Sequence, residues 1–161
     1  MSLTIRRARP GEAGLVLSLV RELAAFQKLH HEVEATEAMI DAALFGSNPQ
    51  LFCEIAEWQD EPCGFAIWFH NFSTFSGRPG IYLEDLFVRP AQRGKGIGTA
   101  LLIHLAKECV ENGWPRLQWS VLDWNTSAIE FYKSLGAAVL DHWSICRLDG
   151  PALTALAQGT H

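Results

Sequence analysis

The pattern of apolar and polar positions along the chain predicts alternating strands and helices. Residues 3–8 alternate as in a strand, and apolar residues recur at helical spacing from residue 10 to about residue 27. Pro10 suits the start of that helix, because its missing N–H would have no partner there in any case. Thr36 is a suitable N-cap for a second helix that ends near Phe45.

The middle of the chain predicts three strands. Runs at 51–57 and 64–70 are joined by the short polar segment 59–62, which indicates an antiparallel pair. A stretch rich in Ser and Gly, 72–80, predicts a loop before a strongly strand-forming run at 81–88.

The last third of the chain continues this alternation. We expect a third helix at about 98–112, a strand at 117–122, a fourth helix from Asn125 to about Leu135, and one or two strands within 137–148. Gly136 is well placed to end the fourth helix in a left-handed conformation. The order β-α-α-β-β-β-α-β-α-β predicts a mixed α/β domain that is neither doubly wound nor a barrel, with parallel pairing only around the third and fourth helices.

Composition narrows the class of protein. The 161 residues suit one domain over 1–161, and 48% apolar with 19% charged residues is ordinary for a soluble globular protein. No apolar run reaches the roughly 18–20 residues that span a bilayer, and the N-terminus lacks a signal-peptide pattern. We therefore expect a cytoplasmic protein without a membrane partner. The net charge of −5 argues against a nucleic-acid partner and fits a cationic small substrate.

The cysteines and histidines do not indicate a metal or redox site. Cys53, Cys63, Cys109 and Cys146 form no CxxC pair and lie in apolar stretches, so we expect buried, reduced thiols. The adjacent pair at 30–31 is not a metal-binding spacing, and no HExxH is present, so we expect no metal.

The segment from Arg93 to Gly98 lies between the strand-forming run at 81–88 and the third helix. Its three glycines let the backbone approach a ligand without a Cβ clash. The first N–H groups of the following helix have no partner within the helix, and the helix dipole favours an anion there. Arg93 and Lys95 add positive charge, and Thr99 adds a hydroxyl. The segment suits a pyrophosphate, although a glycine turn by itself is equally compatible with a structural role.

Two common nucleotide motifs do not match this segment. A Walker A loop requires GxxxxGK[ST], which the chain lacks. The dinucleotide fingerprint requires GxGxxG, and here Gly98 comes one residue too early.

A different family pattern does match. Arg93-x-x-Gly96-x-Gly98 fits the Q/R-x-x-G-x-G/A signature of the GNAT superfamily of acetyl-CoA-dependent N-acetyltransferases, which also lies between a strand and a helix. Segments 82–88, 121–125 and 131–137 resemble its diamine acetyltransferase branch, which includes spermidine/spermine and thialysine N-acetyltransferases. The resemblance extends over nearly the whole chain. It implies the acyl-CoA N-acyltransferase fold, a central mixed twisted sheet flanked by helices, with acetyl-CoA as co-substrate and a homodimer.

Acetylation of an amine by a thioester poses two proton problems. An alkylammonium with a pKa near 10.4 has no lone pair at pH 7, and reaching the neutral amine costs about 4–5 kcal/mol. The resemblance places a substrate-binding glutamate at Glu84, which we expect to attract the ammonium and to accept its proton directly or through a water molecule. It places the proton donor to the departing thiolate at Tyr132. Without the resemblance, Glu84 could equally be a strand carboxylate that faces solvent, and Tyr132 an aromatic residue of the core.

Asp85 follows Glu84 directly and points to the opposite face of a regular strand, a distinction that a bulge would weaken. No Ser-His-Asp or Cys-His arrangement is apparent from the spacing. We therefore expect direct attack by the amine in a ternary complex.

The resemblance implies cofactor contacts from three segments. The backbone of the strand would pair with the pantetheine arm like an added strand, and one of its N–H groups would hold the thioester oxygen. The expected cofactor-binding residues are Leu86, Phe87, Val88, Arg93, Gly94, Lys95, Gly96, Ile97, Gly98, Thr99, Asn125, Thr126, Ser127, Ala128 and Tyr132. The expected substrate-binding residues are Phe26, Gln27, Ser73, Thr74, Glu84, Asp85, Gln118, Trp119 and Ser120.

The choice of amine is less constrained. The spermidine/spermine and thialysine N-acetyltransferases both carry glutamate where this chain has Gln27. One carboxylate that could bind a distal ammonium is therefore missing. We therefore expect a small diamine or a lysine-like amino acid such as thialysine. Ser73 and Thr74 would bind its α-amino or carboxylate end, or only form a turn. Two alternatives stay open: an acetyltransferase acting on proteins or peptides, and a non-catalytic acyl-CoA-binding module.

Overall fold

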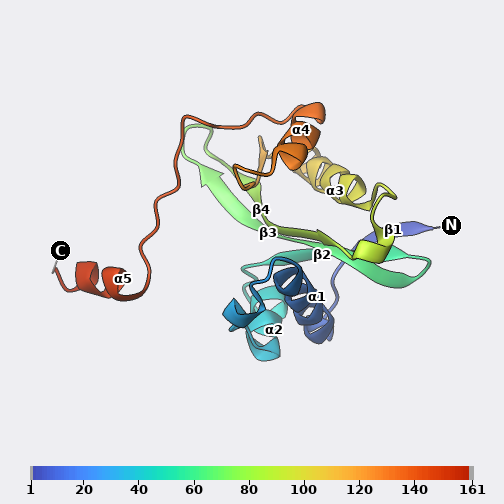
Figure 1. The fold of residues 1–161 in the computed structure, drawn as a ribbon, viewed down its shortest axis with the longest axis horizontal. Helices are drawn as coiled ribbons and strands as arrows, with labels where there is room; N and C mark the ends of the chain where they lie inside the picture. Colours follow the sequence, from blue (N-terminus) through green and yellow to red (C-terminus); the bar gives the residue numbers. More distant parts are fainter. Residues whose placement is uncertain (1, 160–161) are drawn as a thin grey trace. The chain divides into compact units, whose positions relative to one another are not determined.

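The computed structural model in Figure 1 describes residues 2–159. The chain divides after Ser120 into two compact units. Unit 1, which ends at Ser120, contains the sheet and helices α1 to α3. Unit 2, which begins at Val121, contains α4 and α5. None of the helices among residues 2–159 is both long enough and apolar enough to cross a membrane.

Unit 1 is built on a five-stranded mixed sheet in the order β1-β2-β3-β4-β5. Its strands are β1 (Leu3–Arg7), β2 (Phe52–Trp58), β3 (Glu61–Ser73), β4 (Arg78–Val88) and β5 (Leu117–Gln118). Neighbouring strands are antiparallel except β4 and β5, which are parallel. The mixed sheet and the parallel pair around the third helix, both expected from the sequence, are confirmed.

Helices cover both faces of this sheet. The helical elements of unit 1 are α1 (Ala13–Phe26), the 3-10 turn η1 (His30–Glu32), α2 (Glu37–Phe45), the 3-10 turn η2 (Pro90–Gln92) and α3 (Ile97–Asn112). Helices α1 and α2 lie on one face and α3 on the other (Figure 1). The core under α1 is fully apolar, and it includes Val16, Leu19, Leu23, Cys53, Ile55, Phe65, Ile67 and Phe87.

Local signals in the sequence correctly located several element ends. The hydroxyl of Thr36 accepts a hydrogen bond from the backbone N–H of Met39, as an N-cap does. The β2–β3 hairpin turns at Gln59 and Asp60, which both have positive φ, as a two-residue turn of the mirror-image type requires. The antiparallel pair is confirmed, with a shorter link than the expected segment 59–62.

The loop expected at 72–80 is mostly wrong. Strand β3 continues to Ser73 and β4 begins at Arg78, so only four residues form the turn. Backbone pairing explains the difference, because Phe72 faces Pro79 and Ser73 faces Arg78 across the ladder. The Ser- and Gly-rich composition reflects a tight hairpin end and not a long loop.

Unit 2 departs further from the expected pattern. Helix α4 (Thr126–Ser134) begins after Asn125 and is followed by Gly136 with φ +95°, as expected. The strands expected within 137–148 are wrong, because that segment has no regular structure, and the tail forms α5 (Gly150–Ala157). The strand expected at 117–122 shrinks to the two residues of β5.

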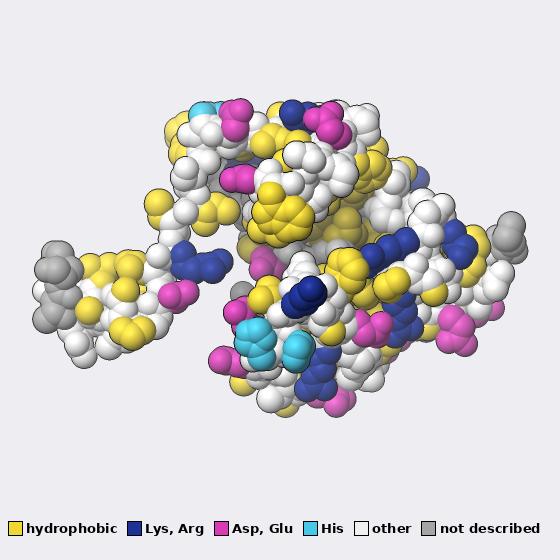
Figure 2. Space-filling model, viewed as in Figure 1, with side chains coloured by type: hydrophobic (Ala, Val, Ile, Leu, Met, Phe, Trp, Pro, Cys, Tyr) yellow, Lys and Arg dark blue, Asp and Glu magenta, His cyan; other side chains and the backbone are white. Residues whose placement is uncertain are grey.

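A strand is stable only when its backbone groups find a partner strand, and the segment 137–148 has none among the described residues. Its apolar side chains are consequently exposed, as Trp143 at 72% and Ile145 at 81% show. Figure 2 shows further apolar side chains on the surface of α5. The expectation of four buried thiols is also wrong for Cys146, which is exposed, and correct for the other three.

Candidate active site

The glycine segment forms the turn that starts helix α3. Gly94 and Gly96 have φ of +80° and +75°, a left-handed conformation that other residues rarely adopt, and Gly96 is the N-cap. The buried stripe of the helix begins at Ile97. Ala106 lies outside this stripe and is exposed. The local backbone thus accounts for two of the three glycines.

Gly98 has no such explanation within the fold. It has no positive φ, and a Cβ added to it would meet no atom within 4 Å. The same open space surrounds Gly94 and Gly96. Together with the free N–H groups at the start of α3, these positions form a backbone surface that a bulky side chain would fill. The residues therefore fit a pyrophosphate approaching the helix N-terminus.

Replacing Gly98 by Val is expected to block this surface and leave the fold intact. Acetyl-CoA should bind about tenfold or more weakly, because losing even one charge-assisted hydrogen bond costs about 1.5–3 kcal/mol. Gly98→Ala should retain binding, since the matching signature admits Ala there. The matched control is Ala106→Val, which adds bulk to an exposed position of the same helix. Equal affinities of all three variants, measured by calorimetry, would remove the pyrophosphate from this position.

A buried carboxylate ties α3 to the sheet. Glu54 of β2 is 1% exposed, and it accepts a hydrogen bond from Nε of Arg7 at 2.7 Å. Its other oxygen lies 3.0 Å from Nε2 of His104 on α3. Arg7 also pairs with Glu108, one turn further along α3, at 3.4 Å. These contacts fix the position of the helix that begins at the glycine segment.

Strand β4 contains a bulge at the predicted base. Asp85 pairs with Ile67 and Leu83 pairs with Trp68, so Glu84 is an extra residue without a partner across the ladder. Asp85 shares a face with Ile67, whose side chain belongs to the core under α1. Glu84 is exposed and Asp85 is half-buried. The bulge thus replaces the simple alternation that would point the two acids to opposite faces.

Asp85 is an unusual acid in this position. Burial, with a further contribution from the neighbouring charge of Glu84, raises the pKa of the Asp85 carboxyl from 3.8 to about 6. Acids with a pKa shifted towards neutrality are characteristic of sites that bind cations or move protons. No ion pair of Asp85 is found among the described residues. The acidic pair therefore offers a concentrated negative site for an ammonium group.

The raised pKa predicts that Asp85 destabilises the fold at neutral pH. Because the pKa of this carboxyl is higher in the folded than in the unfolded state, the free energy of unfolding decreases as pH rises from about 4 to about 6. Asp85→Asn should therefore increase the free energy of unfolding at pH 7 by on the order of 2 kcal/mol. Urea titrations at pH 7 and pH 4 measure this gain, which should nearly vanish at pH 4. A gain of equal size at both pH values would contradict the shift.

The edge of β4 that faces β5 is largely free of strand pairing. Strand β5 pairs only with Ile81 and Tyr82, and among the described residues the stretch 83–88 has a strand neighbour only on the β3 side. The side-chain Nε of Arg93 donates to the carbonyl of Val88 at 2.9 Å. This edge, which includes the expected residues Leu86, Phe87 and Val88, suits an extended ligand that pairs like a strand.

The other candidates of unit 1 occupy three places. Gln27 is exposed and is the C-cap of α1. Ser73 closes the β3–β4 turn, because its hydroxyl accepts from the backbone N–H of Ser76 at 3.2 Å, and Thr74 is exposed in the same turn. The hydroxyl of Ser120 lies 2.7 Å from that of Tyr82. Gln118 is the β5 residue opposite Tyr82, and Trp119 follows it half-buried.

Sequence reasoning missed Tyr82. Its ring lies 5.2 Å from that of Phe69, centroid to centroid, and its hydroxyl fixes Ser120. The contact joins β4 to the end of β5, and no local pattern around Tyr82 indicates it. Lys95 was expected to add positive charge for the pyrophosphate. In the structure its ammonium donates to Oε1 of Gln92 at 3.0 Å and lies over the ring of Trp58.

In unit 2, the candidates lie at the start and on one side of α4. The Asn125 side chain accepts from the backbone N–H of Ala128 and the hydroxyl of Ser127, both at 3.3 Å, so its capping role is confirmed. Thr126 and Ser127 are exposed in the first turn. Tyr132 is half-buried, and burial raises the pKa of its hydroxyl above the usual value. The phenol thus stays protonated at neutral pH.

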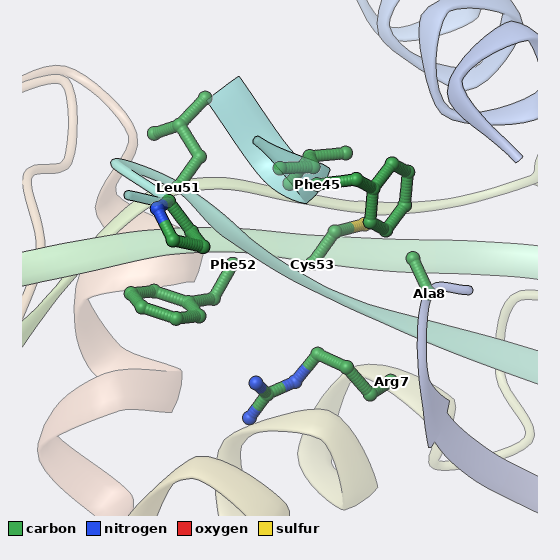
Figure 3. A pocket seen from close by; sticks show the side chains of 8 residues that line it. Arg7, Ala8, Phe45, Leu51, Phe52 and Cys53 are labelled. Atoms are coloured by element: carbon green, nitrogen blue, oxygen red, sulfur yellow. The ribbon is translucent and has the colours of Figure 1, made fainter. Parts of the chain in front are cut away.

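A cavity of about 190 Å³ lies elsewhere in unit 1, where β2 begins. Figure 3 shows Phe45 and Leu51 on one side of the strand and Phe52 and Arg7 on the other. The lining is apolar except for Arg7, whose guanidinium is already paired with Glu54. With no unpaired polar group in its lining, this cavity is a poorer candidate than the β4–α3 region.

Comparison with known proteins gives consistent matches. The acetyltransferase (GNAT) family matches residues 17–137. A thialysine N-epsilon-acetyltransferase of Sus scrofa is 36% identical, covering 97% of this chain and 98% of its own length. An L-ornithine N5-acetyltransferase of Arabidopsis thaliana is 30% identical, covering 94% of this chain and 86% of its own. An integron cassette protein from the mobile metagenome of V. cholerae superposes with a TM-score of 0.82 at 29% identity, covering 98% and 99%.

Proposed function

The chain belongs to the acetyltransferase (GNAT) family of acetyl-CoA-dependent N-acetyltransferases, and on that premise we propose that it acetylates a primary amine of a small molecule. The observation that carries the proposal is the β4–α3 region. There an acidic pair at a strand bulge precedes the glycine turn that starts a helix. The family match runs from residue 17 to 137 and so crosses the boundary between the units. We propose that residues 1–161 act as one domain.

The acidic pair accounts for binding and deprotonation of the amine. Glu84 and Asp85 attract an ammonium, and a bound cation favours the ionised form of both carboxylates. We propose Glu84, the exposed member, as the base that takes the proton directly or through water. Asp85 holds the charge beside it, since its half-buried carboxyl is already ionised above about pH 6. Together they offset part of the roughly 4–5 kcal/mol needed to deprotonate the amine at pH 7.

The second proton requirement concerns the thiolate that leaves when the amine attacks the thioester. We propose that Tyr132 donates to this sulfur. Full transfer from a phenol to a thiolate of pKa near 8.5 is uphill by at least about 2 kcal/mol. The main contribution of Tyr132 is therefore a hydrogen bond that strengthens as charge develops, with transfer completed as CoA departs. Acetyl-CoA supplies the acyl group, and the backbone of 86–88 and 94–99 binds its pantetheine and pyrophosphate parts.

The relatives point to the class of amine. The Sus scrofa and Arabidopsis thaliana proteins are named for thialysine and L-ornithine, both amino acids with a primary amine at the end of the side chain. We propose such an amino acid, or a small diamine, as the substrate. Gln27 in place of a carboxylate argues against long polyamines, which carry additional ammonium groups. Ser120, fixed by Tyr82, and Thr74 are the polar groups that we assign to the distal end of the substrate.

We also propose a homodimer. The segment 137–148 has a strand-like sequence but no strand partner within residues 2–159, and it exposes Trp143, Ile145 and Leu148. Exposed apolar stretches of this kind are typical of association surfaces. A second copy would supply the missing partner strand. Light scattering should give about twice the chain mass of 17.9 kDa, whereas a mass of one chain would exclude the dimer.

Initial-rate kinetics and substrate competition test the proposed reaction. With thialysine and acetyl-CoA varied together, direct attack in a ternary complex predicts intersecting double-reciprocal lines, and an acetyl-enzyme predicts parallel lines. Thialysine, L-ornithine and 1,4-diaminobutane should outcompete peptides with a free N-terminus or lysine. Faster acetylation of the peptides would favour the protein acetyltransferase alternative.

A further inference from the structure

Phe26, the last residue of α1, is a large apolar side chain with an exposed fraction of 57%. Its ring centroid lies 4.2 Å from Cζ of Arg93 in the glycine segment. The ring of Phe87 is also within reach of the same guanidinium, at 5.6 Å. Phe26 and Phe87 are 6.3 Å apart, centroid to centroid. An exposed phenylalanine is thus placed against the face of one specific cation.

The guanidinium of Arg93 is oriented without being neutralised. Its Nε donates to the carbonyl of Val88, and its Cζ lies over the rings of Phe26 and Phe87. Among the described residues, no ion pair joins Arg93 to a carboxylate. Stacking on aromatic rings leaves the in-plane N–H groups of a guanidinium able to bind an anion. Arg93 is therefore held as a pre-oriented phosphate ligand.

The same contact reaches the amine side of the proposed site. Gln27, a candidate for the amine, follows Phe26 directly, and Lys28 then turns the chain with φ +61°. The helix itself is anchored separately, because Arg89 pairs with Glu22 through two hydrogen bonds of 2.9 and 2.7 Å. Loss of the Phe26 ring would therefore release the end of α1 from Arg93 without displacing the helix.

We propose that Phe26 is a positioning residue that couples the binding of the two substrates through Arg93. This rests on the proposed function, in which the glycine segment binds the pyrophosphate and the end of α1 borders the amine. A pyrophosphate that fixes Arg93 also fixes the ring stacked on it, and with it the backbone of Gln27. Because such linkage is reciprocal, a bound amine must strengthen CoA binding by the same factor as CoA strengthens amine binding.

The test measures the Kd of CoA with and without saturating thialysine, a pair that binds without reacting. Wild-type protein should bind CoA about two- to fivefold more tightly when thialysine is present, the range expected for one exposed cation–π contact. In Phe26→Leu, CoA should bind about two- to fivefold more weakly, and thialysine should no longer change its Kd. Phe26→Tyr keeps the ring and should retain both values. Phe72→Leu, which removes a ring exposed to a similar degree (59%), is the matched control.

A double-mutant cycle with Arg93→Ala separates coupling from general damage. In that background, Phe26→Leu should have no further effect on the Kd of CoA. An equal effect with and without Arg93 would overturn the proposal, and so would a Phe26→Leu protein that retains the wild-type values. Failure of the wild-type protein to bind CoA would instead overturn the proposed function, and the role of Phe26 with it. Thermal melts confirm that each variant is folded.

Discussion

Tyr132→Phe is expected to lower kcat about 100-fold, the lower end of what a proton donor contributes, while the Kd of acetyl-CoA changes less than about twofold. The phenyl ring keeps the packing of α4, where Tyr132 lies against Phe131 at 5.7 Å between ring centroids. Only the hydroxyl is lost. Because burial raises its pKa, the hydroxyl is protonated throughout the neutral range, as the proposed donor must be.

The measurement is release of CoA thiol under saturating substrates, with affinity determined separately by calorimetry. Tyr82 is the other tyrosine of the chain and provides the control. Tyr82→Phe removes a hydroxyl bonded to Ser120, so it should raise the KM of the amine but keep kcat within about threefold. An unchanged kcat in Tyr132→Phe would exclude the hydroxyl as proton donor.

Glu84→Gln is the second substitution with a large expected effect. Without the base, kcat/KM for the amine should fall about 100-fold at pH 7. The remaining reaction depends on amine that is already neutral in solution. Because the free ammonium has a pKa near 10.4, the rate of the variant should rise about tenfold per pH unit between pH 7 and pH 9. The wild-type rate should be nearly constant over that range, since the enzyme takes the proton from the bound ammonium and the Asp85 carboxyl beside it is ionised above about pH 6.

A change of charge alone must be separated from loss of the base. Glu111→Gln removes one negative charge from an exposed position of α3 and should leave the rate and its pH profile unchanged. A Glu84→Gln variant with the flat pH profile of the wild type would show that Glu84 does not accept the proton.

Features of the site that depend on a few neighbouring residues could be predicted from the sequence. Thr36 and Asn125 cap helices through contacts three residues away, and Gly96 starts α3 because a left-handed residue is needed there. The β4–α3 region and its family signature could therefore be predicted from the sequence. The roles of Glu84 and Tyr132 came from the resemblance and stay predictions until the variants are measured.

Features that depend on pairing between distant segments could not be predicted. The bulge that sets Glu84 apart is a property of the register between β3 and β4, which the sequence of β4 alone does not contain. Arg93 contacts the ring of Phe26, which lies 67 positions earlier in the chain. The segment 137–148 was expected to contain one or two strands but has no strand partner in the part of the chain that the structure describes, so its strand propensity was misleading.

The most direct test of amine acetylation by this protein is a single reaction with purified protein, acetyl-CoA and thialysine. We expect CoA thiol release that depends on thialysine, with mass spectrometry showing thialysine that carries one acetyl group on an amine. L-Ornithine and 1,4-diaminobutane should give the corresponding products at comparable or lower rates. Binding of acetyl-CoA without release of thiol in the presence of any of these amines would show that the protein does not acetylate this class of substrate.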